Sequence, residues 1–246
     1  LDMFLDKPSD APIKSLAHLL KNIPPARLFE ESLKLLQSGH GVKTYRLLRQ
    51  YGLFEPLFPL LTPYFTEYED SMTEKMILRA LTSTDERVAD KLPINPAFLF
   101  AAFFWYPLRE RVEVLKNEGG LNNYDAYALA SNDILEQLCK SLAVPRRHTA
   151  VIREIWLLQL QFLKRTPKSV QRAIEQSKFR AGFDLLVMRA EIEGGEAVEL
   201  AAWWHEYQFS NESQRQDLVK ELPSQPKKRK YHRRKRHHSA KKVSHE

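Results

Sequence analysis

The sequence has 246 residues, of which 43% are hydrophobic, 8 are glycine and one is cysteine. A single cysteine excludes an intramolecular disulfide, and so few glycines disfavour tight hairpins and glycine-rich phosphate-binding loops. The formal net charge is +7, but residues 227–246 hold ten of the 38 cations and one of the 31 acids, so the 226 residues before them carry more acids than cations.

The first part of the chain is predicted to form short helices. A helix is expected to begin at Pro25, because proline suits the first turn, and to end at Gly39 and Gly41. A second helix is predicted over residues 44–51. Prolines break residues 53–65 into short turns packed by aromatic side chains.

Longer helices are predicted to follow. Ser71 and Glu74 form a capping-box pattern, and Asn95 before a proline is typical of a helix start. Apolar stripes continue over residues 124–142, and Pro145 starts a long helix. No segment alternates with the period of a strand. We therefore predict an all-α protein, with irregular multi-helix neck and body domains followed by a disordered basic tail.

Changes of composition divide the chain into three predicted parts. Residues 1–66 form a small helical unit, residues 67–222 form a larger helical body, and residues 223–246 form the tail. No apolar run approaches the ~18 residues of a membrane span, and the start of the chain does not resemble a signal peptide. We expect a cytoplasmic protein with no membrane partner.

The tail carries almost nothing apolar, so it is expected to stay disordered and to bind the phosphates of a polynucleotide by displacing counterions. A solubilising tail and a nuclear localisation signal are the alternatives. The surrounding cations disfavour a metal site at its histidines. The tail residues predicted to bind RNA are Lys227, Lys228, Arg229, Lys230, Arg233, Arg234, Lys235 and Arg236.

The folded part offers no arrangement typical of catalysis. The acids of residues 67–70 lie in a predicted loop, whereas Glu191 and Glu193 lie on a predicted helix, where residues two apart point in different directions. Both groups are expected to be solvated charges rather than a site for the divalent ions of nucleotidyl transfer. Neither a catalytic residue nor a metal ligand is predicted in this chain.

Cations near aromatic residues in the body are candidates for RNA binding, because single-stranded RNA is held by such mixtures. The alternative is that they are ordinary surface charges of helices above a core of aromatic residues. The predicted RNA-binding residues of the body are Arg146, Arg147, Lys178, Arg180 and Arg189. Lys164, Arg165, Lys168, Trp203, Trp204 and Tyr207 belong to the same pattern.

Three separated segments resemble the bacterial poly(A) polymerases, which are class II nucleotidyltransferases related to the tRNA CCA-adding enzymes. They are IPPARLFEESLKLL at residues 23–36, NPAFLFAA at 95–102 with WYP at 105–107, and KFRAGFDLL at 178–186 with RAE at 189–191. The segments occur in the family's order. The resemblance runs from about Ala11 through the basic tail.

The resemblance implies a helical neck, a body that guides RNA and a basic extension, all after a catalytic head. The chain begins with Leu1 and is expected to be a fragment without that head, and therefore inactive by itself. No cofactor is expected here, whereas Mg²⁺ and ATP are implied for the intact enzyme. Arg27, Glu30 and Glu31 match a neck motif that supports the nucleotide pocket.

The implied activity of the intact enzyme is the addition of AMP from ATP to RNA 3′ ends, which promotes decay of the RNA. RNA 3′ ends and RNA-decay proteins are the implied partners. Two alternatives stay open: a helical protein–protein scaffold without enzymatic activity, and the body of a tRNA CCA-adding enzyme.

Overall fold

The computed structural model describes residues 5–220 and 222, and every regular element in that part of the chain is a helix. The α-helices of the first half are α1 (Lys7–Leu16), α2 (Pro25–Leu36), α3 (Gly41–Gln50), α4 (Phe54–Leu57), α5 (Met72–Ala89), α6 (Pro96–Phe103) and α7 (Trp105–Asn117). Those of the second half are α8 (Asn123–Leu142), α9 (Arg146–Phe162), α10 (Pro167–Ile174), α11 (Phe179–Glu193), α12 (Gly195–Phe209) and α13 (Glu212–Lys220). Two 3₁₀ helices, η1 (Ala17–Asn22) and η2 (Pro59–Tyr64), connect the early elements. The all-α prediction is confirmed, while the predicted disordered tail lies outside the described residues.

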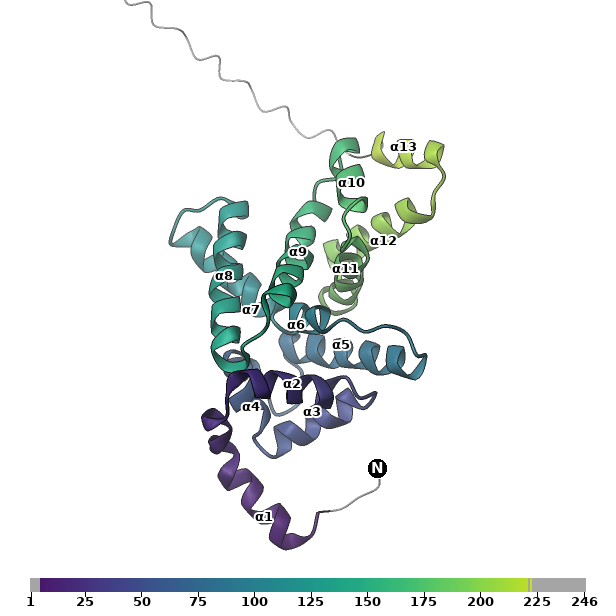
Figure 1. The fold of residues 1–246 in the computed structure, drawn as a ribbon. Coiled ribbons are helices and arrows are strands. Elements are labelled where there is room, and N and C mark those ends of the chain that lie inside the picture. Colours follow the sequence, from purple (N-terminus) through teal and green to yellow (C-terminus); the bar gives the residue numbers. More distant parts are fainter. Residues whose placement is uncertain (1–4, 221, 223–246) are drawn as a thin grey trace, which may run out of the picture.

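The helices form an elongated arrangement in which α6 lies near the centre (Figure 1). Helices α2 to α5 lie on one side of it, α7 and α8 extend from it as an antiparallel pair, and α9 leads away towards α10 to α13. Helix α1 projects from the body and contains no buried residue (Figure 1). The Tyr51 hydroxyl donates a hydrogen bond to Asp10 of α1.

A first hydrophobic core joins helices α2 to α9. Helix α6 is apolar around most of its circumference, so it is buried against α5 and α9. Its Phe103 contacts Phe58, whose ring centroid lies 4.6 Å from that of Phe54. The Trp156 indole of α9 donates a hydrogen bond of 2.9 Å to the carbonyl of Ala101, so this large buried side chain leaves no unsatisfied donor.

A second core lies between α9, α10, α11 and α12. It contains Phe162, Phe179 and Trp204, and the Trp204 indole donates to the carbonyl of Phe162 at 3.0 Å. Helices α9 and α11 approach so closely that a Cβ atom added to Gly182 would lie 2.7 Å from Leu158 Cδ1. Helices α9 and α11 each contribute side chains to both cores and therefore connect them.

Several helix starts agree with the sequence, and one does not. Asn95 caps α6 by accepting a hydrogen bond from the Ala97 amide at 3.0 Å, as its side-chain chemistry predicts. Gly41, expected to end a helix, instead begins α3. Its amide donates to Asp85 Oδ1 of α5 at 2.6 Å, so a carboxylate 44 residues away caps this helix.

Glu74 also differs from its predicted role. Its amide is capped by Ser71 Oγ at 3.1 Å, as expected, but its fully buried carboxylate turns towards Arg49 Nη1, 2.9 Å away. The same carboxylate accepts hydrogen bonds from the amide and hydroxyl of Thr66, at 2.9 and 2.8 Å. This network crosses the predicted division between residues 66 and 67, as does the first core, and the three-part division stays a prediction.

Candidate nucleic-acid interface

Arg146 and Arg147 occupy the first turn of α9 and are both exposed. Neither forms an ion pair with any residue that the structure describes. Cations are unfavourable at a helix N-terminus, where the exposed amides already create a positive potential. The start of α9 is therefore a strongly positive surface that an anion would neutralise.

His148 anchors this positive turn to the rest of the fold. Its ring lies 5.8 Å from the ring of Phe29 on α2, and its Nε2 atom lies 3.3 Å from Nε of Arg147. Burial, and then the charge of Arg147, lower the pKa of the imidazole below its ordinary value. The neutral ring is therefore the form that this packing favours.

A second cationic cluster lies where α9 ends and α10 begins. It consists of four cations without an acid between them in the sequence. None of the four forms an ion pair within the described part of the chain, although the Arg165 guanidinium lies 5.5 Å from the ring centre of Trp203. The members of this α9–α10 cluster are Lys164, Arg165, Lys168 and Arg172.

Two other predicted RNA-binding residues lie at the start of α11. Lys178 stands at the N-cap position of the helix and is partly exposed. Arg180 is exposed, and its Nε atom lies 2.9 Å from Oδ1 of Asp184 one turn further on. Since Asp184 already neutralises part of this charge, Arg180 offers less to a phosphate than the cations at the two ends of α9. RNA binding by both residues stays a prediction.

Arg189, predicted from the sequence to bind RNA, is engaged inside the protein. Its side chain is only 12% exposed, and two of its nitrogens lie 3.0 Å from the carboxylate of Glu193. A third nitrogen donates to Gln159 at 3.0 Å, and the guanidinium lies 4.5 Å from the ring centre of Trp105. A role for Arg189 in RNA binding stays untested, but its donors are occupied by protein groups.

Glu193 is the acid of this internal network rather than a solvated charge. Its carboxylate is 14% exposed and accepts hydrogen bonds from Arg189 and from the Trp105 indole, the latter at 3.3 Å. Burial acts to raise the pKa of Glu193, but its hydrogen bonds to Arg189 and Trp105 and the charges of Arg189 and Arg109 together lower that pKa overall. Its neighbour Glu191 pairs with Arg79 Nε at 2.5 Å.

Two of the three acids of residues 67–70, in the loop before α5, are engaged in similar contacts. Glu69 pairs with Arg46 at 3.1 Å, and Asp70 accepts a hydrogen bond from the Thr66 hydroxyl at 2.7 Å. Within residues 5–220 and 222, no three side chains of His, Cys, Asp or Glu gather closely enough to hold a metal ion.

The three residues that match the neck motif lie on α2 and are exposed. Arg27, Glu30 and Glu31 occupy the side of the helix opposite to the buried Leu28 and Phe29. Glu31 lies 2.9 Å from Lys34, whose hydrogen bond and charge lower the pKa of the glutamate. These side chains are therefore free of the core and accessible from outside the described fold.

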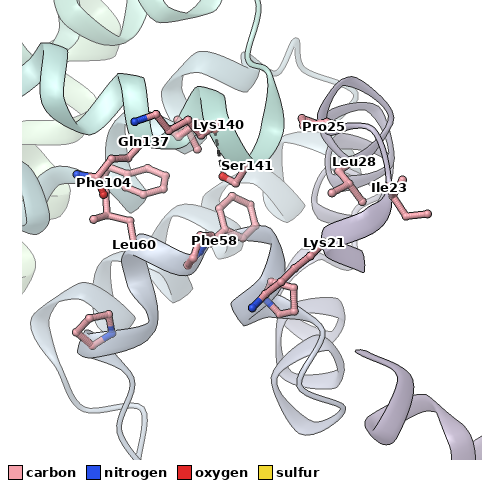
Figure 2. A pocket seen from close by; sticks show the side chains of 14 residues that line it. Lys21, Ile23, Pro25, Leu28, Phe58, Leu60, Phe104, Gln137, Lys140 and Ser141 are labelled. Carbon is pink, nitrogen blue, oxygen red and sulfur yellow. Dashed lines mark hydrogen bonds between the residues drawn. The ribbon is translucent and has the colours of Figure 1, made fainter. Parts of the chain in front are cut away.

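A cavity of about 540 Å³ lies between η1, the start of α2, η2 and the end of α8 (Figure 2). Its lining is mainly apolar and includes Leu28, Phe58 and Phe104. Lys21 and Lys140 lie on opposite sides of it (Figure 2). The lining contains no carboxylate, cysteine or histidine, so it offers shape and positive charge rather than a catalytic group.

Comparisons with known families agree with this helical, cation-bearing surface. Residues 2–65 match a family model described as "Probable RNA and SrmB-binding site of polymerase A". Residues 119–238 match a second model, described as "Polymerase A arginine-rich C-terminus". Both models describe segments of one kind of enzyme, and the chain belongs to the poly(A) polymerase family. The resemblance indicated by the three sequence segments is thereby confirmed.

Individual relatives bear the name of that enzyme. The chain is 73% identical over 239 residues to Poly(A) polymerase I of Haemophilus influenzae. The matched region covers 96% of the chain and 53% of the relative. It is 50% identical over 227 residues to Poly(A) polymerase I of Salmonella typhimurium, covering 92% of the chain and 49% of the relative. The chain thus spans about half the length of the curated relatives that it matches.

Among the helices of residues 5–220, none has the length and apolar character that a membrane span requires.

Proposed function

We propose that this chain is the RNA-holding part of a poly(A) polymerase. The observation that carries the proposal is the pair of cationic clusters at the two ends of α9, Arg146 with Arg147 and the α9–α10 cluster, none of which forms an ion pair among the described residues. Unneutralised cations gathered on a neutral body are suited to phosphates. The basic residues of 227–246 would add to this charge.

The intact protein is proposed to add AMP units from ATP to RNA 3′ ends, as the name of its relatives suggests. Nucleotidyl transfer of this kind uses divalent ions held by carboxylates. The acids of residues 5–220 and 222 do not fit that role, because no three of them gather closely enough to hold a metal ion, and Glu69, Glu191 and Glu193 are engaged by Arg46, Arg79 and Arg189. The contribution of the described residues is therefore to bind and orient RNA.

Further parts of the proposal concern the surroundings of the chain. Arg27, Glu30 and Glu31 are accessible on α2, and they are proposed to support the nucleotide pocket of the intact enzyme. The description of the model that matches residues 2–65 also contains SrmB, which supports SrmB as a second partner of the N-terminal unit. RNA-decay proteins and a cytoplasmic location belong to the same proposal.

Binding of oligo(A) to the full chain at several salt concentrations tests the RNA-holding role. The logarithm of the affinity should fall with the logarithm of the salt concentration by about 0.7 per phosphate neutralised. Deleting residues 227–246 should flatten that slope and leave a remainder from the folded body. A chain that retains no oligo(A) at low salt would overturn the proposal and favour a helical protein–protein scaffold.

A further inference from the structure

A hollow of about 440 Å³ lies between the first turn of α8, the last turns of α9 and the start of α10. In Figure 1, α8 and α9 run in opposite directions and move apart towards this end. Leu157 and Leu160 of α9 give the hollow an apolar lining. Lys164 and Arg172 line it from the α9–α10 cluster, and Tyr124 lines it from α8.

The hollow continues a stripe along the face of α9 on which Arg153 donates a hydrogen bond of 3.0 Å to Asn132 of α8. Successive residues of an α-helix turn by about 100°, so Arg146, Arg153 and Leu157 fall close to one line along the helix axis, and Lys164 lies just beyond the end of the helix. None of these four side chains is buried. The line begins at the exposed arginines of the first turn and ends at the α9–α10 cluster. A single extended ligand lying along α9 could contact both.

The charge of the hollow suits a polyanion. Its nine lining residues include two cations and no acid. A neighbouring hollow of the same size shares Asn123, Leu160 and Leu163 with it, but differs in charge. The charged residues of that neighbour are Arg109, Lys116, Arg189, Glu113, Glu193 and Glu196. Since its cations are matched by acids, a nucleic acid would favour the hollow beside α10.

Tyr124 gives the hollow an aromatic surface. Its side chain is 64% exposed. Tyr124 is the second residue of α8, and Asn122 caps this helix by accepting hydrogen bonds from the amides of residues 124 and 125. The rings of Trp203 and Tyr207 stack on each other, with centroids 5.2 Å apart. Arg165 and Arg215 lie against them, at 5.5 and 5.3 Å. Tyr124 is not covered in that way.

We propose that single-stranded RNA occupies this hollow, with a base stacked on Tyr124 and the adjoining phosphates bound by Lys164 and Arg172. The inference rests on the proposed RNA-holding function and assigns to it a particular site in the folded body. Base stacking on an exposed aromatic ring tolerates any base, and cations beside the ring follow the backbone. The site therefore holds a strand without reading its sequence.

The stacking contact can be tested in the full chain by oligo(A) binding at fixed salt. Tyr124→Ala should weaken binding by about 5-fold to 150-fold, the range expected for loss of one stacked base, whereas Tyr124→Phe should preserve it. Tyr68→Ala is the matched control, because Tyr68 is 80% exposed but lies among the acids of the loop before α5. The control should bind oligo(A) like the unmodified chain.

The phosphate contacts predict a different readout. Lys164→Gln and Arg172→Gln should each lower the salt slope by about 0.7, whereas Tyr124→Ala should leave the slope unchanged. Lys43→Gln, a change at an exposed cation of α3, should lower it less. Oligo(A) carrying a single 5-iodouridine should crosslink under ultraviolet light to Tyr124, and mass spectrometry of the peptides would locate the bond.

The outcomes separate this site from the general function. If the unmodified chain binds oligo(A) but Tyr124→Ala behaves like Tyr68→Ala and no crosslink forms at residue 124, the hollow does not hold RNA although the RNA-holding role stands. If the unmodified chain shows no salt-sensitive binding, the proposed function itself fails. Thermal unfolding of each variant checks that the fold is intact, which the exposure of these side chains leads us to expect.

Discussion

Arg189 and Arg146 are both helical arginines that the sequence predicts to bind RNA, yet they lie in opposite environments. Arg189 is enclosed by Glu193, Gln159 and Trp105, whereas Arg146 points away from the fold at the start of α9. A buried cation is stable only when its hydrogen bonds are satisfied. Its removal leaves its partners unsatisfied and therefore lowers the free energy of unfolding. An exposed cation without a partner contributes little to the stability of the fold, so its removal should mainly lower the affinity for a ligand.

The largest loss of unfolding free energy is expected when the most buried carboxylate is replaced. Glu74→Ala would leave Thr66 without its acceptor and Arg49 with Glu55 as its remaining ion-pair partner, and breaking a buried pair in this way costs about 3–5 kcal/mol. Urea unfolding measures the change. Glu30→Ala, an exposed change on α2, should alter the unfolding free energy by less than about 0.5 kcal/mol. Equal losses for the two variants would contradict the importance of burial.

The internal network around Arg189 should give the next largest loss. Arg189→Ala leaves Glu193 partly buried with fewer donors, and an unsatisfied charged group of this kind costs roughly 2–3 kcal/mol. At a temperature at which the variant is folded, its affinity for oligo(A) should equal that of the unmodified chain. A selective loss of RNA affinity with unchanged stability would instead place Arg189 in the RNA site.

Close packing beneath that network should give a smaller loss. Gly182→Ala would bring a methyl group within 2.7 Å of Leu158 Cδ1, and such overpacking typically costs about 1–3 kcal/mol. Gly182 also supplies the carbonyl that Gln159 binds at 2.8 Å, so movement of α11 would disturb the residue that holds Arg189. Differential scanning calorimetry should show a lower Tm. Gly119→Ala, in the turn after α7, is a poor control because its Cβ would also lie 2.7 Å from a carbonyl oxygen.

At the other end of the comparison, Arg146→Gln combined with Arg147→Gln should leave stability within about 0.5 kcal/mol of the unmodified chain. The slope of RNA affinity against salt should nevertheless fall by about 0.7 for each phosphate that the variant no longer binds. Fluorescence anisotropy with labelled oligo(A) provides this slope. If stability falls and the slope does not, these arginines support the fold rather than RNA binding.

The smallest effect concerns pH. The folded-state pKa of His148 is lowered by burial and by Arg147, so the fold favours the neutral ring. Its contribution to stability is complete above the ordinary pKa of about 6.5 and is lost as the pH falls below that value. His148→Phe keeps an aromatic ring against Phe29 but does not titrate. The variant should therefore lose less unfolding free energy than the unmodified chain between about pH 7 and pH 5.

Local chemistry predicts much of the fold, because helix starts depend on neighbouring residues. Asn95 and Ser71 cap the helices that their positions indicate, and the stripe over residues 124–142 forms α8 almost to the residue. The prediction for Gly41 is wrong because Asp85, which caps its helix, is remote in sequence. A pattern of local residues cannot reveal a partner that only the tertiary fold brings near.

The candidate site is only partly predictable for the same reason. Charge along the sequence identifies the cations at both ends of α9, but it cannot distinguish them from Arg189. Besides the neighbouring Glu193, Arg189 is enclosed by Gln159 and Trp105, which are remote in sequence. The hollow beside Tyr124 combines residues of α8, α9 and α10, and no spacing within one helix indicates it. Only the packing of the helices separates the occupied cations from the available ones.

Helix α9 fixes the distance between the two cationic clusters. Its 17 residues span about 25 Å at 1.5 Å each, and the helix packs in both cores along that length. A stacked nucleic-acid strand advances about 3.4 Å per nucleotide, so roughly eight nucleotides are needed to reach from one end to the other. The length of α9 would then set the shortest strand that contacts both clusters, and oligonucleotides of fewer than about eight nucleotides should bind with markedly lower affinity.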